Sequence, residues 1–290
     1  MTLILPNTSS VVVSGLRQLL GQAKVRNDVP TLTAYAVDAS IYRMTPHAVV
    51  LAEHEGDIDT VVRFAVERGI PLTPRAAGTN LTGSAIGSGI ILDISKMNRI
   101  LEVNGEERWT RVQPGIVLAE LNKQLGRRNL LFGPDPSSGD MCKLGGMLAN
   151  NSAGPHTLIY GAVKDNVQAM RVCLPSGSWL SASSMNLNDP ELDQTLVAHP
   201  SLKPILDLVQ RQRSLIDSKK PTVSKNSCGY NLFGLADGLS RGVFDLPKLF
   251  VGSEGTLGVV SEATLRLVPK PQGTLTALIH FRRLEEVGDA

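Results

Sequence analysis

The sequence has few of the residues that mark disulfide-stapled domains and nucleic-acid-binding surfaces. Only three of its 290 residues are cysteines, Cys142, Cys173 and Cys228, and no two of them form a CxxC pair. This spacing excludes a metal-binding knuckle and a disulfide framework, and it favours a reducing compartment. Aromatic residues make up 4% of the chain. Because Lys plus Arg number 29 and Asp plus Glu number 27, the sequence does not favour a nucleic-acid partner.

Long apolar runs are also missing. No run approaches the roughly 18 apolar residues that a membrane-spanning helix requires. The N-terminus lacks a basic region and is interrupted by Pro6, Asn7 and Ser9, which argues against a secretory signal. We therefore expect a cytoplasmic protein without a membrane span, located at most at the inner face of a membrane.

The pattern of apolar residues near the N-terminus predicts a β-α-β arrangement. Residues 48–52 form a short apolar run, and residues 57–69 carry apolar side chains at the i, i+3, i+4 and i+7 positions of an amphipathic helix. We expect Asp57 to cap this helix and Gly69 to end it. Further predicted strands lie at residues 70–75, 90–95, 100–104, 108–115 and 166–177, with a helix from Leu118 that ends before Asn129.

Residues 186–220 have a different character. They are polar, become dense in Lys and Arg toward their end, and carry helical spacing at Leu202, Ile205, Leu206 and Val209. We interpret them as a helical insertion. Because strands and helices mix throughout the chain, we predict an α+β class. Strand patterns return after the insertion, at residues 248–253, 259–269 and 274–281.

Two glycine-rich segments are candidates for ligand binding. Residues 71–95 place small residues directly after a predicted strand, where backbone N–H groups could approach a phosphate. The spacing fits neither GxxxxGK[ST] nor GxGxxG, and a simple turn is the alternative. Residues 132–161 combine Gly145 and Gly146 with the amides of Asn150 and Asn151, which could bond a polar ring edge or a diphosphate. Close helix–strand packing is the alternative there.

Single side chains carry less information. A glycine-rich kink places Glu254 between two predicted strands, where a bond to neighbouring backbone N–H groups competes with a ligand role. The five histidines show no metal-ligand spacing, so we predict no metal site and assign no catalytic residue. Among them only His156 lies in a ligand-binding segment, and a turn histidine is the simpler interpretation. We interpret Cys142 and Cys228 as packing residues.

Taken in order, the motifs resemble the FAD-binding domain of the family that includes vanillyl-alcohol oxidase and p-cresol methylhydroxylase. Within that family the sequence is most similar to the FAD-linked 2-hydroxy acid dehydrogenases, which act on D-lactate, D-2-hydroxyglutarate or glycolate. The resemblance implies a two-lobed FAD-binding domain of the p-cresol methylhydroxylase type. The motifs that carry it are PRAAGTNLTG, GPDPSS, LGGMLANNSAG, YG, CGYNL and GSEGTLGVVSEATLRLVPKP.

The resemblance also implies a division of the chain. Residues 1–44 would be a helical lead-in, and residues 45–271 the FAD-binding domain with its insertion at about 186–220. Residues 272–290 would be the start of a truncated cap domain, whose missing part would hold the substrate. The implied cofactor-binding residues are Arg75, Ala76, Ala77, Gly78, Thr79, Asn80, Leu81, Thr82, Pro134, Gly145, Gly146, Asn150, Asn151, Gly161 and Val260.

The implied activity is oxidation of a 2-hydroxy acid to a 2-oxo acid with hydride transfer to the flavin. The electrons would pass to an acceptor such as an iron–sulfur region or protein. Relatives that link FAD covalently have a histidine where this chain has Thr79, so we expect non-covalent FAD. Two alternatives stay open: a module that binds FAD but is inactive by itself, and an alditol- or aldehyde-type oxidase of the same fold.

Overall fold

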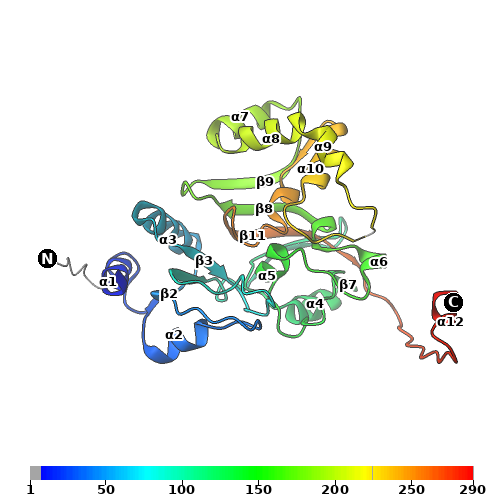
Figure 1. Ribbon diagram of the computed structural model, residues 1–290, viewed down its shortest axis with the longest axis horizontal. Helices are drawn as coiled ribbons and strands as arrows, with labels where there is room; N and C mark the ends of the chain where they lie inside the picture. The colour runs from blue at the N-terminus through cyan, green and yellow to red at the C-terminus, as the bar shows by residue number, and fades with distance from the viewer. Residues whose placement is uncertain (1–7, 224, 290) are drawn as a thin grey trace.

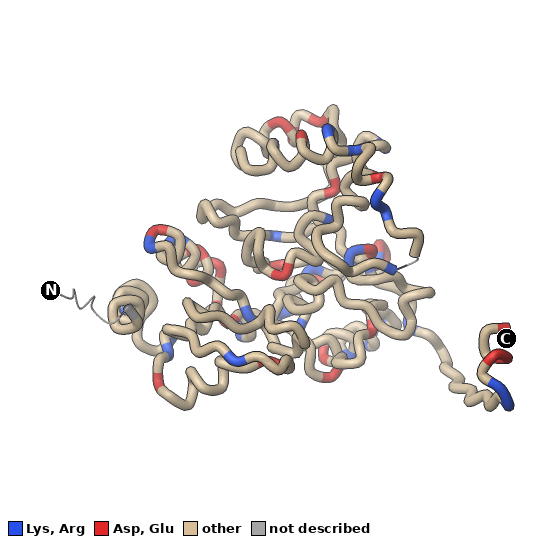
Figure 2. The backbone as a smooth tube through the Cα atoms, viewed as in Figure 1, with Lys and Arg blue, Asp and Glu red and all other residues tan. Residues whose placement is uncertain are grey.

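Two sheets organise the molecule, which we describe from a computed structural model covering residues 8–223 and 225–289 (Figure 1). We call residues 8–95 the four-stranded lobe and residues 96–271 the six-stranded lobe. The strand order is β1-β2-β4-β3 in the first sheet and β10-β9-β8-β11-β6-β5 in the second. A two-stranded sheet pairs β12 with β7. Basic and acidic residues are interspersed along the chain (Figure 2).

The four-stranded lobe contains the predicted β-α-β unit. Strands β2 and β3 both pair with β4 in parallel, so the carboxyl ends of these three strands lie at the same edge of the sheet. Helices α1 and α3 pack their apolar faces on this sheet, with Leu16 and Ile58 fully buried. The elements are α1 (Thr8–Leu20), β1 (Val25–Arg26), α2 (Val29–Tyr35), β2 (Ala48–Leu51), α3 (Glu55–Arg68), β3 (Leu72–Arg75) and β4 (Ile90–Asp93).

The first part of the six-stranded lobe contains antiparallel strands and three short helices, α4, α5 and α6. The predicted leucine stripe of α4 is buried. The elements are β5 (Ile100–Asn104), β6 (Trp109–Val112), α4 (Leu118–Gly126), β7 (Leu130–Leu131), α5 (Leu144–Ala149), α6 (Thr157–Tyr160), a 3₁₀ turn (Val163–Asp165), β8 (Val167–Cys173) and β9 (Trp179–Asn186).

The rest of this lobe contains the helical segment predicted at residues 186–220. Its helices place Leu202, Leu206 and Val209 in the larger core cluster. The elements are α7 (Pro190–Ala198), α8 (Leu202–Arg211), α9 (Arg213–Ser218), α10 (Leu232–Ser240), β10 (Val243–Asp245), α11 (Pro247–Phe250), β11 (Val259–Arg266) and β12 (Val268–Pro269). Helix α12 (Glu286–Asp289) lies beyond this lobe, near the C-terminus.

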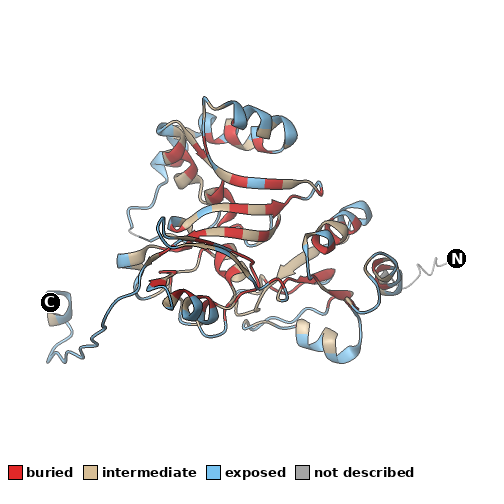
Figure 3. Ribbon diagram, turned by 180° about the vertical axis from the view of Figure 1, so that it is seen from behind, coloured by how far each residue is buried: buried red, intermediate tan, exposed pale blue. Residues whose placement is uncertain are grey.

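Three details of the prediction are wrong. Helix α3 begins at Glu55 with His54 as its N-cap, and Asp57 lies in its first turn. Residues 247–250 form helix α11 instead of a strand, because Pro247 has the fixed φ that suits the first turn of a helix. Residues 274–281 form no strand, since no described strand pairs with them and an isolated strand is not stable in water. This segment is exposed (Figure 3).

The two lobes share part of one core. Cys173 at the end of β8 and Val259 at the start of β11 belong to the cluster that fills the four-stranded lobe. At the same junction the Glu55 carboxylate accepts hydrogen bonds from Arg171 and Ser261. Within the described residues, no helix is long and apolar enough to cross a membrane. The shared core fixes one lobe against the other, and the cleft described next lies between them.

Candidate functional site

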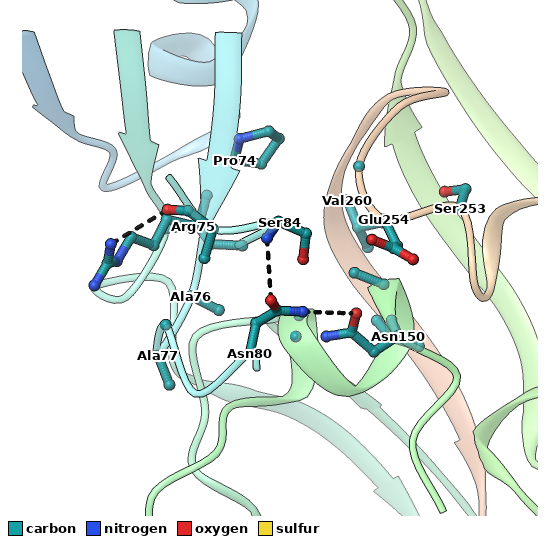
Figure 4. A pocket seen from close by; sticks show the side chains of 18 of the residues that line it. Pro74, Arg75, Ala76, Ala77, Asn80, Ser84, Asn150, Ser253, Glu254 and Val260 are labelled. Carbon is teal, nitrogen blue, oxygen red and sulfur yellow. Dashed lines mark hydrogen bonds between the residues drawn. The ribbon is translucent and has the colours of Figure 1, made fainter. Parts of the chain in front are cut away.

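A cleft lies where the two lobes meet (Figure 4). One wall follows the end of β3 and continues into the loop after it. The opposite wall is formed by α5, by the turn between α11 and β11, and by β11 itself. Ligands of open parallel sheets commonly bind at the carboxyl ends of the strands. The lining includes Pro74, Arg75, Ala76, Ala77, Gly78, Thr79, Asn80, Ser84, Gly145, Gly146, Ala149, Asn150, Ser253, Glu254 and Val260.

The loop of residues 76–80 presents unpaired backbone donors. None of its five N–H groups donates a hydrogen bond to another described residue. Two of its carbonyls are bonded, because Ala76 O accepts from the Ser95 hydroxyl and Gly78 O accepts from Ala39 N–H. An array of unpaired N–H groups beside a cleft is a general way to bind a phosphate.

The side chain of Asn80 fixes the shape of the same loop. Its Oδ1 accepts hydrogen bonds from the N–H groups of Thr82 and Ser84, at 2.7 and 3.0 Å. Its Nδ2 donates to Oδ1 of Asn150 across the cleft, at 3.3 Å. Figure 4 shows this chain of bonds crossing from one lobe to the other. Asn80 therefore orders the loop through its side chain while its own N–H stays unpaired.

Arg75 lines the cleft, but its guanidinium points away from the centre (Figure 4). Its Nη1 donates to the carbonyls of Tyr35, Val37 and Ala85, at distances of 3.3, 2.9 and 3.2 Å. A Cβ on Gly78, whose φ is +70°, would lie 2.5 Å from this guanidinium. Arg75 was implied as a cofactor-binding residue, but its guanidinium donates to backbone carbonyls and supports the loop from behind.

Gly145 and Gly146 have different surroundings. A Cβ on Gly145 would lie 3.0 Å from Ile94 and 3.1 Å from Pro114, so this residue allows α5 to pack closely. A Cβ on Gly146 would have no atom within 4 Å. Both glycines line the cleft. Close packing explains the first glycine, whereas open space at the second leaves room for a ligand.

The turn between α11 and β11 contributes Ser253 and Glu254 to the cleft lining, and for Glu254 the sequence left a ligand role open. Glu254 has a φ of +52°, a conformation that non-glycine residues rarely adopt, and its N–H donates to Ala149 O. Its carboxylate accepts no hydrogen bond from the described residues and faces the cleft (Figure 4). In the sequence, the glycines on both sides of Ser253 and Glu254 indicate this turn. Ser84 and Ala149 belong to the two small-residue segments that the sequence indicated for ligand binding, and both line the cleft.

Five of the predicted residues lie outside the cleft lining. Leu81 and Thr82 are exposed on the far part of the loop, and Pro134 is buried. Asn151 is buried, and its Oδ1 accepts a hydrogen bond from Lys164 N–H. Gly161 ends α6 with a φ of +73°. Their roles toward a cofactor stay predictions.

The histidine and cysteine side chains take no part in the cleft lining. His156 is exposed and pairs with the Asp135 carboxylate through Nδ1. Burial raises the pKa of the Cys142 thiol, and burial first and then Asp59 raise that of Cys173 to about 12. Cys228 is exposed, so its interpretation as a packing residue is wrong. Among the described residues no group of His, Cys, Asp and Glu could hold a metal ion.

Residues 46–183 match the family model described as an FAD binding domain. The match identifies an FAD-binding domain within the chain, and FAD is the cofactor of that domain. The resemblance stated from the sequence is confirmed.

Named relatives lie among 2-hydroxy acid dehydrogenases. A D-2-hydroxyglutarate dehydrogenase of Pseudomonas putida is 34% identical over 280 residues, covering 93% of this chain and 27% of that protein. The enzyme of the same name from Escherichia coli is 32% identical, covering 92% of this chain and 27% of that protein. A D-lactate dehydrogenase of Anaerostipes hadrus is 29% identical, covering 86% of this chain and 42% of that protein. The chain therefore spans less than half the length of these relatives.

The fold is also found in a solved structure of alkyldihydroxyacetonephosphate synthase. The TM-score is 0.65 at 20% sequence identity, covering 94% of this chain and 43% of that one. This similarity confirms the predicted mixed α and β fold of the FAD-binding type.

Proposed function

We propose that the protein binds FAD non-covalently in the cleft and serves the oxidation of a 2-hydroxy acid to a 2-oxo acid. The observation that carries the proposal is the loop of residues 76–80, whose five N–H groups have no acceptor among the described residues. Such a loop suits the diphosphate of FAD without needing a positive side chain. The names of the relatives support the substrate class, in particular D-2-hydroxyglutarate and D-lactate.

Each wall of the cleft has its own part in this proposal. The N–H groups of residues 76–80 hold the diphosphate, and Gly146 leaves space for the cofactor against α5. The Glu254 carboxylate offers an acceptor to hydroxyl donors of the cofactor, and Val260 offers an apolar contact. Bound FAD supplies the redox chemistry by accepting a hydride equivalent from the substrate α-carbon. Thr79 cannot form a histidyl link to the flavin, so the cofactor is held by these contacts alone.

The remaining parts of the proposal concern cell context. Three free cysteines suit a reducing compartment, so we place the protein in the cytoplasm or at the inner face of the membrane. The substrate electrons leave through an acceptor such as an iron–sulfur region or protein.

An absorption spectrum of the purified chain with FAD tests the binding. FAD at 100 times its dissociation constant should raise the unfolding free energy by about 2.7 kcal/mol. After acid precipitation the yellow colour should stay in the supernatant, and colour in the pellet would contradict non-covalent binding. A protein that is colourless and gains no stability with FAD would overturn the proposal.

Binding without turnover is the second candidate, because neither a histidine nor a lysine lines the cleft among the described residues. Anaerobic addition of D-2-hydroxyglutarate or D-lactate separates the two. Bleaching of the flavin bands supports the dehydrogenase, whereas an unchanged flavin spectrum supports the binding module. Bleaching only by alditols or aldehydes would move the proposal to another oxidase of the same fold.

A further inference from the structure

The cleft loop is held from behind by a segment that precedes the matched FAD-binding region. We call residues 35–39 the N-terminal brace. The family model begins at residue 46, and no brace residue lines the cleft. The brace nevertheless contacts the loop at several points. It therefore affects the cleft through the loop rather than through a ligand.

Arg75 joins the brace to both ends of the loop. It is the last residue of β3, and its Nη1 donates to Tyr35 O and Val37 O in the brace and to Ala85 O beyond the loop. The guanidinium carbon also lies 5.1 Å from the centre of the Tyr35 ring, within the range of a cation–π contact. A single cation thus connects three segments of backbone.

A second connection runs through a buried carboxylate. Asp93, at the end of β4, is only 6% exposed. Its Oδ2 accepts a hydrogen bond from the Tyr35 hydroxyl, and its Oδ1 accepts one from Ser95 N–H. The Ser95 hydroxyl donates in turn to Ala76 O at 3.1 Å. This chain of bonds leads from the brace to the first residue of the loop.

Two further bonds join the brace directly to the loop region. Ala39 N–H donates to Gly78 O at 3.1 Å, and Ala85 N–H donates to an Asp38 carboxylate oxygen at 3.4 Å. The carbonyls of Ala76 and Gly78 therefore accept hydrogen bonds from Ser95 and Ala39, which lie behind the loop, while the loop N–H groups stay unpaired. Orienting peptide groups in advance lowers the entropy cost of binding an anion.

We propose that Tyr35, Asp38 and the Arg75 guanidinium are positioning residues, which hold residues 76–80 in the conformation that presents their N–H groups to the cofactor phosphates. The inference rests on the proposed FAD binding. It makes the brace an integral part of the cofactor site, and it gives Arg75 a role that does not involve contact with a phosphate.

Measured FAD dissociation constants of variants test the inference. Tyr35→Phe removes the hydrogen bond to the Asp93 carboxylate and keeps the ring, so it should weaken FAD binding about 5-fold, the order of one hydrogen bond. Arg75→Ala removes charged hydrogen bonds and should weaken binding about 30-fold. Tyr42→Phe is the matched control, because the Tyr42 hydroxyl has no described partner; its affinity should equal that of the wild type.

Two readouts separate positioning from direct contact and from general destabilisation. The salt dependence of FAD affinity should be the same for Arg75→Ala and the wild type, whereas loss of a phosphate contact would reduce it. Because both residues act on one loop, the Tyr35→Phe/Arg75→Ala double variant should lose less than the product of the single losses. Urea denaturation of each apo variant shows whether that variant is folded. If a variant does not fold, FAD binding by Asp38→Ala is measured in its place.

The outcomes are distinct. Wild-type affinity in folded Tyr35→Phe and Asp38→Ala would overturn the inference and leave the proposed function standing. A reduced salt dependence in Arg75→Ala would assign Arg75 to the phosphates and overturn its positioning role. A wild-type chain that binds no FAD would overturn the proposed function, and the inference with it.

Discussion

The two lobes contribute to the cleft in different ways. The four-stranded lobe presents backbone: the loop of residues 76–80 offers N–H groups, while Arg75 and Asn80 hold it with their side chains. The six-stranded lobe presents side chains and space, with Glu254 and Val260 on one wall and open room at Gly146. A parallel strand end can expose successive N–H groups because its loop need not continue a ladder. In an antiparallel sheet, turns and bulges direct side chains toward a ligand.

The largest expected effect concerns the cores of the two lobes. Phe132 is fully buried in the larger cluster and Leu16 in the smaller one. Phe132→Ala should lower the unfolding free energy by about 4 kcal/mol, and Leu16→Ala by about 3 kcal/mol. Because the lobes share a core, urea denaturation of both variants should show one transition, and two separate transitions would show that the lobes are independent.

The second prediction concerns a buried ion pair of the four-stranded lobe. The Asp57 carboxylate is 3% exposed and lies 2.7 Å from the Lys24 ammonium. Burial raises the pKa of Asp57, but the hydrogen bonds from Lys24 and Glu53 N–H outweigh it, and the net pKa is lowered. Because Lys24 keeps partial exposure, Asp57→Asn should cost about 2 kcal/mol at pH 7, below the range for fully buried pairs.

The same lowered pKa gives a pH dependence. The stabilisation by Asp57 is complete above its unfolded pKa of about 3.9, and it is lost as the pH falls through the lower folded pKa. The difference in unfolding free energy between the wild type and Asp57→Asn should therefore shrink as the pH falls from 5 toward and below the folded pKa. A constant difference over that range would contradict the assignment.

The third prediction fills the space at Gly146. Gly146→Leu should leave the unfolding free energy of the apo protein within about 1 kcal/mol, because its Cβ meets no atom and helices tolerate Leu better than Gly. FAD affinity, measured by fluorescence quenching, should fall about 100-fold. Gly105→Leu is the control, since a Cβ on Gly105 likewise meets no atom within 4 Å and this residue lies outside the cleft. Equal affinities in the two variants would place the cofactor elsewhere.

The smallest effect concerns thiol exposure. Cys142 and Cys173 are buried, whereas Cys228 is exposed. Native protein should react with one equivalent of a thiol reagent and denatured protein with three. Cys228→Ser should abolish the native reaction and change stability by less than about 0.5 kcal/mol. Rapid labelling of a second thiol would show that the six-stranded lobe opens.

Sequence periodicity predicted the elements that depend on local pattern. The β-α-β unit and the buried leucine stripe of α4 are present because each has a continuous apolar face. The strands predicted at residues 248–253 and 274–281 are wrong, because short apolar runs fit a helix or a strand equally well and a strand needs a partner. The sequence cannot tell whether one is available.

The candidate site was predictable to a similar extent. Ala76 and Gly78 line the cleft, in agreement with the small residues after a strand that indicate an open loop, whereas Asn80 was implied by the family resemblance. The direction of the Arg75 guanidinium was not predictable, since its carbonyl acceptors at Tyr35 and Val37 lie 40 and 38 residues away. The exposure of Glu254 to the cleft depends on a positive φ that the sequence indicates only through neighbouring glycines.

The core shared through Cys173 and Val259 has a consequence for cofactor exchange. Both side chains are at most 4% exposed, so a hinge motion that separates the lobes would bring apolar surface into water. The entrance of the cleft must therefore widen by movement of its loops, while its floor stays fixed. Cofactor residence time would then depend on how often residues 76–85 detach from the brace. The cofactor could therefore leave quickly even while both lobes stay stably folded.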